Sequence, residues 1–480
     1  MSKYTIVVGL EMHCEGSKTN SKVFSPAKNE YTKNPNSNVN PIDMGFPGIL
    51  PVLNEKCVEQ SVMMATVLHA RVPEYMYFER KNYYYPDLPK GYQITQNPPE
   101  ECVGNGGYID IERPDGSTFR VDIDNLHLEE DTARSTHLYN TTNMNYNRAC
   151  APLFELVTKP CIYSSDDAVL FLEYIRLIYQ YLNISEADSK KGQIRCDVNV
   201  NLKGEDGKYI TPKVEVKNVN SFSAVKDAID YEVNRQISLY EAGKKDELRQ
   251  ETRRWDDDSG TTIKMRDKED LEDYKYFVEP NIPKYKLTKE FVDNVVKEIP
   301  QLPYERKSKY INELNLSDYD ARILIKDKSI SDYFEECLKL DIDAKTAANW
   351  ITGQILGYIY KCDKDISEIY LTPLRLFKIL DNLKSGKISS KQAKDLFNLV
   401  LEKEEEPEKI MKDEGMEQIS DDGAIKSIIE EVLSENPSQI EAYKAGKTNM
   451  FDYFVGQVMK KTKGQANPTL VKEILSELLK

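Results

Sequence analysis

Residues 194–202, IRCDVNVNL, and residues 213–219, KVEVKNV, decide the fold of the first part of this chain. In both stretches apolar and polar residues alternate, which predicts two β-strands, and Gly204 and Gly207 between them predict a hairpin. The apolar positions should face a core, and the polar positions should form one continuous opposite face. That face would carry Arg195, Asp197, Asn199 and Asn201 on the first strand and Lys213, Glu215 and Lys217 on the second.

The polar face of this hairpin has two interpretations. A solvated sheet face is the simpler one. Asp and Asn are, however, depleted in strands, and three of them alternate here. Side-chain oxygens are the ligands that Mg²⁺ prefers, so the pattern also fits a cation site.

Outward from the hairpin, the first 290 or so residues mix strands with helices. YTIVVGL at 4–10 predicts a strand, and GYIDIERPDGSTFRVDI at 107–123 predicts a second hairpin with its turn at Pro114-Asp115-Gly116. Helical spacing predicts helices over about 55–70, 165–183 after a Ser165 N-cap, and 222–241 between Ser221 and Gly243. Beyond about residue 294 the chain becomes helical and rich in Lys and Glu.

The predicted fold class is therefore α+β. We expect a mixed β-sheet cradle domain over 1–293, an all-helical domain over 294–405 and a small helical tail domain over 406–480. The helix-start patterns Asn-Leu-Ser-Asp at 315–318 and Leu-Thr-Pro at 371–373 support the helical part. The charged run EKEEEPEK at 402–409 is either a boundary or a solvated helix end.

The composition restricts the classes of protein to consider. The 480 residues carry 65 Lys and Arg against 80 Asp and Glu, a net charge of −15, which disfavours a broadly basic nucleic-acid surface. The eight Cys include no C-x-x-C pair, and no stretch of about 18 apolar residues occurs. We expect a soluble cytoplasmic protein with no membrane contact. Neither a G-x-x-x-x-G-K-[ST] loop nor a G-x-G-x-x-G fingerprint is present.

Two further segments are candidates for a functional site. Glu11 and His13 follow the first predicted strand at i, i+2, so both could point to one side, and HLEED at 127–131 is a second acidic cluster. Carboxylates and an imidazole drawn from several strands would suit a metal-nucleotide site, although a structural histidine and a surface charge run are the alternatives. FERKNYYYPDLPKGYQITQ at 78–96 mixes cations with tyrosines that could stack on bases, or could simply pack a loop.

Ordered motifs along the whole chain resemble those of the B subunits of aspartyl/glutamyl-tRNA amidotransferases. The matching strings are VGLEMH, SKVFS, NSNVNPIDMGFPGILPVLN, RKNYYYPDLPKGYQITQ, HLEEDTARSTH, YNRACAPLFELV, IRCDVNVNL, VEVKNVNSF, QETRRW and DYKYFVEP. In the last part, QISDDGAI and FVGQVMKKTKGQANPTLV resemble the tail domain of the same family, which also occurs as a free-standing tRNA-binding module.

The resemblance implies a ligase that works in a heterotrimer with an amidase (A) subunit, which supplies ammonia, and with a small (C) subunit. Such an enzyme accepts glutamate misacylated on tRNA(Gln), or aspartate on tRNA(Asn). ATP and Mg²⁺ convert the side-chain carboxylate to an acyl phosphate, and ammonia that the amidase releases from glutamine displaces the phosphate. The site must hold the carboxylate and the γ-phosphate close together. Their repulsion requires neutralisation by a cation rather than a covalent nucleophile.

The resemblance also implies residue roles. As catalytic residues it implies Glu11, His13, Glu130 and Lys81. As metal ligands it implies Glu11, His13, Glu129, Glu130, Asp197 and Glu215. Around the nucleotide or the aminoacyl end it implies Arg80, Lys81, Tyr85 and Asp87. A histidine beside carboxylates also admits Mn²⁺ or Zn²⁺. In the tail, residues 444–472 contain six Lys and one Asp, and we expect Lys460, Lys461 and Lys463 to bind tRNA.

Some positions depart from the family pattern. Cys150-Ala151-Pro152 stands where Gly-Thr-Pro is usual, and Lys190 and Lys191 stand where acidic residues are usual. Two alternatives follow from these departures: a paralogue that amidates a different carboxylate acceptor, and a non-catalytic tRNA-binding scaffold. Retained phosphotransfer chemistry is favoured over the scaffold by five retained residues: Glu11, His13, Glu130, Asp197 and Glu215.

Overall fold

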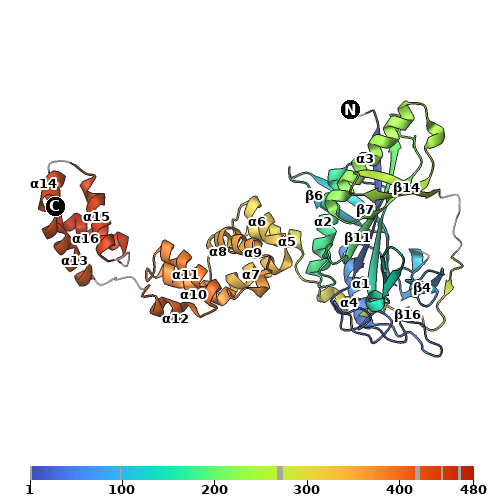
Figure 1. The fold of residues 1–480 in the computed structure, drawn as a ribbon, viewed down its shortest axis with the longest axis horizontal. Coiled ribbons are helices and arrows are strands. Elements are labelled where there is room, and N and C mark those ends of the chain that lie inside the picture. Colours follow the sequence, from blue (N-terminus) through green and yellow to red (C-terminus); the bar gives the residue numbers. More distant parts are fainter. Residues whose placement is uncertain are drawn as a thin grey trace. The chain divides into compact units, whose positions relative to one another are not determined.

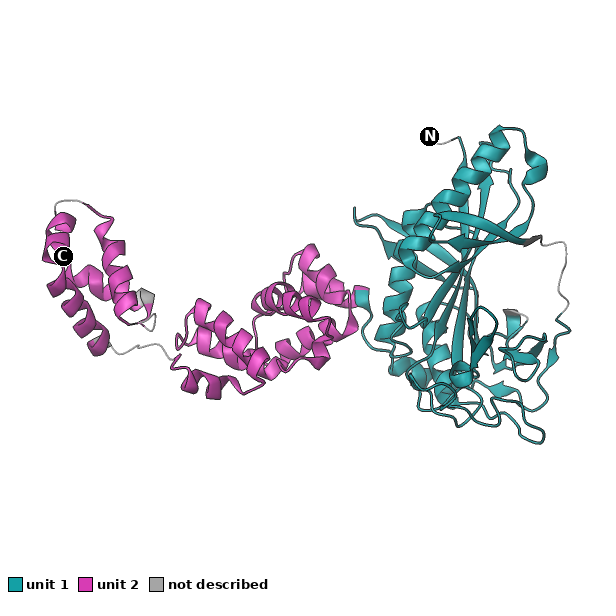
Figure 2. Cartoon of the chain, in the orientation of Figure 1, with its two compact units in different colours: residues 1–303 teal, residues 304–480 magenta. Residues whose placement is uncertain are grey.

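A computed structural model describes residues 3–97, 99–267, 274–416, 422–444, 447–462 and 466–479. The chain divides into two compact units, residues 1–303 and residues 304–480 (Figure 2). Unit 1 holds all the strands among the described residues, and unit 2 is helical (Figure 1). The predicted α+β class, with a mixed sheet first and helices after it, is confirmed.

The described part of unit 1 contains sixteen strands. The strands are β1 (Thr5–Glu15), β2 (Tyr75–Met76), β3 (Glu79–Asn82), β4 (Tyr92–Thr95), β5 (Gly104–Asn105), β6 (Tyr108–Glu112), β7 (Thr118–Glu130), β8 (Arg134–His137), β9 (Thr142–Asn145), β10 (Pro152–Thr158), β11 (Ile194–Lys203), β12 (Val214–Val219), β13 (Glu251–Asp256), β14 (Thr261–Asp267), β15 (Phe277–Val278) and β16 (Tyr285–Lys286). Its helices are α1 (Glu55–Val67), α2 (Ser165–Tyr181), α3 (Phe222–Glu241) and α4 (Lys289–Lys297).

The main sheet runs in the order β14-β13-β12-β11-β1-β10-β7-β5, and β6 pairs with β7. All its pairings are antiparallel except β12 with β13, which α3 connects. Helices α2 and α3 run along one side of the long strands, and the small sheet β15-β3-β4 lies on the other side (Figure 1). The face under the helices is apolar and buried, as Met12, Cys196 and Val216 illustrate. The opposite face is therefore left for polar side chains.

Local sequence explains the helix ends. Ser221 accepts a hydrogen bond from the Ala224 amide before α3, and Gly243 follows that helix with φ +73°, both as predicted. The second helix was predicted to start behind Ser165, but Ser164 is the N-cap and accepts from the Asp167 amide. Both predicted hairpins form, β6–β7 and β11–β12.

Unit 2 consists of short helices. They are α5 (Pro303–Asn312), α6 (Asp318–Ile325), α7 (Lys328–Lys339), α8 (Ala344–Trp350), a π-helical turn (Ile351–Ile355), α9 (Leu356–Cys362), α10 (Pro373–Lys384), α11 (Ser390–Lys403), α12 (Pro407–Asp413), α13 (Asp422–Glu435), α14 (Pro437–Lys444), α15 (Met450–Lys461) and α16 (Pro468–Leu478). The predicted starts are confirmed, because Ser317 caps α6 and Thr372 caps α10 with Pro373 next.

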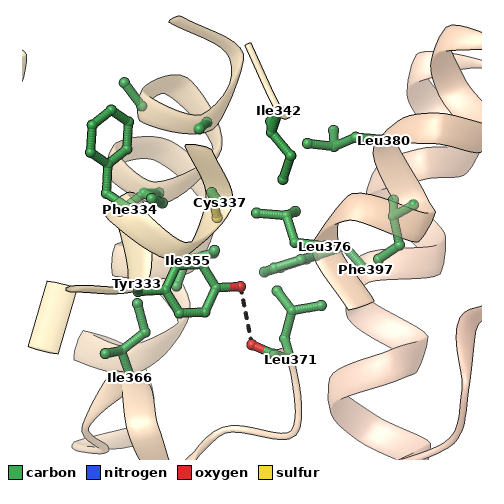
Figure 3. Close-up of a cluster of buried hydrophobic side chains, with 14 of the residues drawn as sticks. Tyr333, Phe334, Cys337, Ile342, Ile355, Ile366, Leu371, Leu376, Leu380 and Phe397 are labelled. Atoms are coloured by element: carbon green, nitrogen blue, oxygen red, sulfur yellow. Dashed lines mark hydrogen bonds between the residues drawn. The ribbon is translucent and has the colours of Figure 1, made fainter. Parts of the chain in front are cut away.

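The buried apolar side chains of unit 2 form two clusters. One spans Tyr310 to Met411, and in it the Tyr333 hydroxyl donates to the Leu371 carbonyl over 3.1 Å (Figure 3). The other spans Ile425 to Leu479. The three-domain division stays a prediction. Its first boundary at 293 falls inside α4, and its second at 405 precedes α12, whose Ile410 belongs to the first cluster.

Candidate active site

Four adjacent strands bring acidic and imidazole side chains to one face of the sheet. On β1, Met12 and Cys14 point into the core, so Glu11 and His13 point the other way. Glu11 lies opposite Asp197 of β11, and His13 lies opposite Glu155 of β10. The strand register therefore brings these side chains together.

Glu155 is the centre of this cluster. Its Oε2 lies 3.3 Å from Nε2 of His13 and 2.9 Å from Nε2 of His127. Two triads share it. Glu11, His13 and Glu155 form one, and His127, Glu129 and Glu155 form the other; in each triad, one possible ligand atom from each residue lies within 4.8 Å of those from the other two. Nδ1 of His127 lies 2.9 Å from Oδ1 of Asn125, and donation from Nδ1 would leave Nε2 facing the carboxylates.

The charges of the cluster are mutually dependent. Burial disfavours the imidazolium, but the carboxylates of Glu155, Glu129 and Glu11 together outweigh burial and raise the pKa of His13 to about 9. Burial and the Glu155 charge raise the pKa of Glu129 and of Glu11. Burial would also raise the pKa of Glu155, but His127 and His13 hold it well below its usual value. Without a cation, protons bound to the imidazoles and carboxyl groups compensate the negative charge of the cluster. A divalent cation would replace those protons.

Three cations complete the cavity that contains this cluster. Its volume is about 350 Å³, and its lining includes Lys81 of β3, Lys217 of β12 and Arg195 of β11. Nζ of Lys217 lies 2.7 Å from Asp197 and 3.3 Å from Glu215. The cavity therefore offers carboxylates and the His13 imidazole for a cation, and ammonium and guanidinium groups for anions. This combination suits the transfer of a phosphoryl group to a carboxylate.

The predicted ligands are distributed unequally around this site. The structure brings together Glu11, His13, Glu129 and Asp197, all of which line the cavity. Glu215 lies on the same sheet face but is buried against Thr252, whose hydroxyl donates to it over 2.9 Å. Their roles as ligands stay predictions.

Glu130 lies apart from the cluster. It follows Glu129 on β7, so its side chain points to the opposite face. As the last residue of β7, it forms a buried ion pair with Lys90 and accepts a hydrogen bond from the Ile94 amide over 2.8 Å. The predicted catalytic and metal-binding roles of Glu130 stay predictions.

Of the residues predicted around the nucleotide, only Lys81 lines the acidic cavity. Arg80 donates through Nε and Nη2 to Glu279 over 2.5 and 3.0 Å and stacks over the Tyr92 ring. Tyr85 is 61% exposed, and the Asp87 carbonyl accepts from the Ala133 amide. The nucleotide-binding roles of these four residues stay predictions.

Sequence reasoning missed Glu155 and His127. Glu155 interrupts the apolar run Pro152–Val157, and a lone carboxylate inside a buried strand is the signal that could have identified it. His127 precedes Glu129 by two positions, so both occupy one face of the same strand.

The predicted tRNA-binding lysines lie at the end of α15. Lys460 is exposed and makes no ion pair among the described residues, whereas Lys461 pairs with Glu431 and Glu435 over 2.8 and 2.9 Å. Lys463 lies outside the described residues. Nowhere in the described part of the chain is a helix both apolar enough and long enough to span a bilayer.

Comparison with known proteins shows the family of this chain. Residues 6–293 match the model of the GatB/GatE catalytic domain, and residues 332–479 match that of the GatB domain. The B subunit of the aspartyl/glutamyl-tRNA(Asn/Gln) amidotransferase of Persephonella marina is 42% identical over 475 residues, covering 99% of each chain. Those of Oceanobacillus iheyensis and Geobacter sulfurreducens are 42% and 40% identical, again covering 99% of each chain. From residue 6 to residue 293, where the clustered carboxylates and imidazoles lie, the chain belongs to the GatB/GatE catalytic domain family.

Proposed function

We propose that this chain is the amidating subunit of a tRNA-dependent amidotransferase. It would convert Glu-tRNA(Gln), Asp-tRNA(Asn) or both to the corresponding amide, using ATP and ammonia. The observation that carries the proposal is the Glu155 cluster, in which two histidines and three carboxylates meet beside Lys81, Arg195 and Lys217. The full-length similarity to B subunits supports the substrate class.

The chemistry has two steps that balance in atoms and charge. A carboxylate oxygen of the aminoacyl group attacks the γ-phosphorus of ATP, which gives an acyl phosphate and ADP. Ammonia then attacks the acyl carbon, inorganic phosphate leaves with the electrons of the C–O bond, and nitrogen loses a proton. Phosphorylation is needed because oxide is a very poor leaving group, whereas phosphate is a good one.

The chain's own residues would hold two anions within reach of each other. Glu11, His13, Glu129 and Glu155 offer the mixed carboxylate and imidazole ligands that suit Mg²⁺, Mn²⁺ or Zn²⁺. When bound, such a cation neutralises phosphate charge. Lys217, fixed by Asp197, and Lys81 present ammonium groups to the same cavity. They would lower the repulsion between the carboxylate and the phosphate.

The proposal implies partner subunits and a cellular location. Ammonia would come from glutamine through an amidase (A) subunit, while a small (C) subunit would complete a heterotrimer. The tail would bind tRNA, and the cytoplasm is where aminoacylated tRNA is available. A reconstitution with both of these partners, glutamine, ATP and Mg²⁺ tests the proposal on Glu-tRNA(Gln) and Asp-tRNA(Asn).

The expected result of the reconstitution is ATP-dependent amide on at least one of the two tRNAs. Amide on neither would refute the proposed function. ATP-dependent amidation of another carboxylate acceptor would then identify a paralogue, and tRNA binding without any ATP turnover would identify a scaffold.

A further inference from the structure

Two lysines line the acidic cavity, and they are held in different ways. Nζ of Lys217 lies 2.7 Å from Asp197 and 3.3 Å from Glu215, so two carboxylates compensate its charge. The ammonium group of Lys81 makes no ion pair and no hydrogen bond with the residues that the structure describes; its Nζ lies 4.9 Å from the centre of the Tyr274 ring instead. A ring face attracts an ammonium group without engaging a particular N–H group. Lys81 is therefore the lysine of this cavity that keeps its donors for a ligand.

A segment that we call the strap, residues 274–279, brings the Tyr274 ring to Lys81. The strap contains β15, which pairs with β3, the strand that carries Lys81. At the far end of the strap, the buried Glu279 carboxylate accepts two hydrogen bonds from the Arg80 guanidinium, which also belongs to β3. The strap is therefore fastened to the strand whose lysine it contacts.

One asparagine fastens the near end of the strap. The backbone N–H of Asn82 donates to the Tyr274 carbonyl over 2.9 Å, and its side-chain Nδ2 donates to the Lys275 carbonyl over 2.6 Å. Lys275 has a φ of +47°, in the left-handed region that residues other than glycine adopt when their surroundings hold them there. Because Asn82 directly follows Lys81 in β3, these hydrogen bonds fix the Tyr274 backbone beside Lys81.

Two further tyrosines fix the orientation of the Tyr274 ring. The centres of the Tyr83 and Tyr276 rings both lie 6.0 Å from the centre of the Tyr274 ring, at interplanar angles of 69° and 75°. These are edge-to-face arrangements, which aromatic rings prefer to direct face-to-face stacking. The plane of the Tyr274 ring is thereby fixed, and the direction in which its face attracts a cation is fixed with it.

We propose that Tyr274 is a positioning residue for amidation, because its ring holds the Lys81 ammonium group in the acidic cavity and leaves the N–H groups for the anionic substrate. The inference rests on the proposed function. A cation that is already in place stabilises the charge on the phosphoryl oxygens during transfer without reorganisation, whereas a lysine without a platform must first be ordered from many rotamers. Loss of the ring should therefore lower kcat more than it raises KM for ATP.

The first test compares variants in the reconstituted amidotransferase. Tyr274→Leu removes the ring and should lower kcat for amide formation about tenfold, with KM for ATP changed less than about threefold. Tyr274→Phe retains the ring face and should restore most of the rate. The matched control is Tyr209→Leu, because the Tyr209 ring centre lies 4.7 Å from Nζ of Lys203 in a similar pair that does not line the acidic cavity. Its kcat should equal that of the unmodified complex.

A second series separates the electrostatic contact from packing. Phenylalanine with one, two or three ring fluorines at position 274 keeps the shape of the ring, but each fluorine weakens the negative charge of the ring face. A folding defect cannot imitate a graded effect of this kind, so kcat should fall stepwise with the number of fluorines. Equal kcat across the series in a complex that forms amide would overturn the role of Tyr274 and leave the proposed function standing.

A third measurement tests the contact without turnover. Reductive methylation with ¹³C-formaldehyde labels the lysines of the full chain, and the Lys81 resonance is the one that is missing from Lys81→Arg. The ring current of Tyr274 should move this resonance upfield in the unmodified chain and in Tyr274→Phe, but not in Tyr274→Leu. An unchanged resonance in Tyr274→Leu would overturn the contact. If the resonance responds as expected but the unmodified complex forms amide on neither tRNA, the contact stands and the proposed function fails.

Discussion

At the scale of single residues, His13 shows how the neighbouring carboxylates set the protonation state of an imidazole in the cluster. Its imidazole is mostly buried, which alone would favour the neutral form, yet the carboxylates of Glu155, Glu129 and Glu11 together raise its pKa to about 9. At neutral pH the cation-free site therefore holds His13 as an imidazolium. A divalent cation must displace that proton, so cation affinity should increase with pH.

The stability of the cation-free protein should depend on pH through the same residue. The pKa of His13 is about 9 in the folded state and near 6.5 in the unfolded state. Between these two pH values the folded state holds a proton on His13 that the unfolded state has lost. The contribution of this proton to the free energy of unfolding is therefore complete below pH 6.5 and is lost as pH rises through 9. Urea unfolding with chelator at pH 6.5, 7.5 and 9 should show a falling free energy of unfolding.

The control for this pH effect is His13→Asn, which is polar but does not titrate. Its free energy of unfolding should fall less steeply over the same interval, since only His127 then contributes a raised imidazole pKa in this cluster. Equal slopes for the variant and the unmodified protein would contradict the proton assignment.

Strand geometry explains which site residues could be predicted. Glu11 and His13 at i, i+2, and Asp197 on a clear alternating strand, were predictable because their apolar neighbours define the core face. Glu129 and Glu130 are consecutive in a strand and must point to opposite faces, but HLEED contains no apolar alternation that shows which one faces the site. Glu155 joins the cluster through the β1–β10 and β10–β7 pairings, which no local pattern reveals.

At the scale of elements, the Lys90–Glu130 pair joins the β3–β4 hairpin to β7 of the main sheet. Both side chains are buried, at 6% and 2% exposure. Removal of one partner should cost about 3–5 kcal/mol, because the remaining charge stays buried and unpaired. We therefore expect Lys90→Met to lower the free energy of unfolding by about that amount.

A double-mutant cycle checks this pair. The variant Lys90→Met with Glu130→Gln should recover part of the loss in urea unfolding, because no unpaired charge remains. If the losses in free energy of unfolding from the two substitutions are additive, the Lys90–Glu130 interaction itself contributes no stability.

Elements with strong local signals were the most predictable ones. The helix α3 has a serine cap, a regular apolar spacing and a terminal glycine, and it forms over the predicted residues. The parallel pairing of β12 with β13 was not predictable, because a whole helix separates the two strands in sequence. The small sheet β15-β3-β4 joins segments almost 200 residues apart, and short strands carry too few residues for a pattern.

At the scale of the whole chain, the net charge of −15 does not reveal how unevenly the charges are distributed. In unit 1 the acidic cavity shares Arg195 with a cavity that six Lys and Arg side chains and only two carboxylates line, and lysines are concentrated near the end of unit 2. Global charge therefore says little about nucleotide or tRNA binding here. The distribution of paired and unpaired cations is more informative.

The lysines of α15 give a matched comparison for tRNA binding. Lys460 is unpaired among the described residues, whereas Glu431 and Glu435 engage Lys461, so Lys460→Ala should weaken tRNA binding more than Lys461→Ala does. If Lys460 contacts one phosphate, its loss should reduce the slope of log affinity against log salt by about 0.7–0.9. Filter binding over a range of salt concentrations measures both effects, and an unchanged slope for Lys460→Ala would exclude a phosphate contact.

The central claim is that the cluster around Glu155 activates the substrate carboxylate. Its most direct test is amide formation by the reconstituted complex carrying Glu155→Gln, with Glu205→Gln in the exposed β11–β12 turn as the matched control. Loss of the carboxylate that both histidines share should lower the rate of amide formation at least about a hundredfold, with tRNA affinity unchanged. The control should retain its rate. Full amidation by Glu155→Gln would contradict the account.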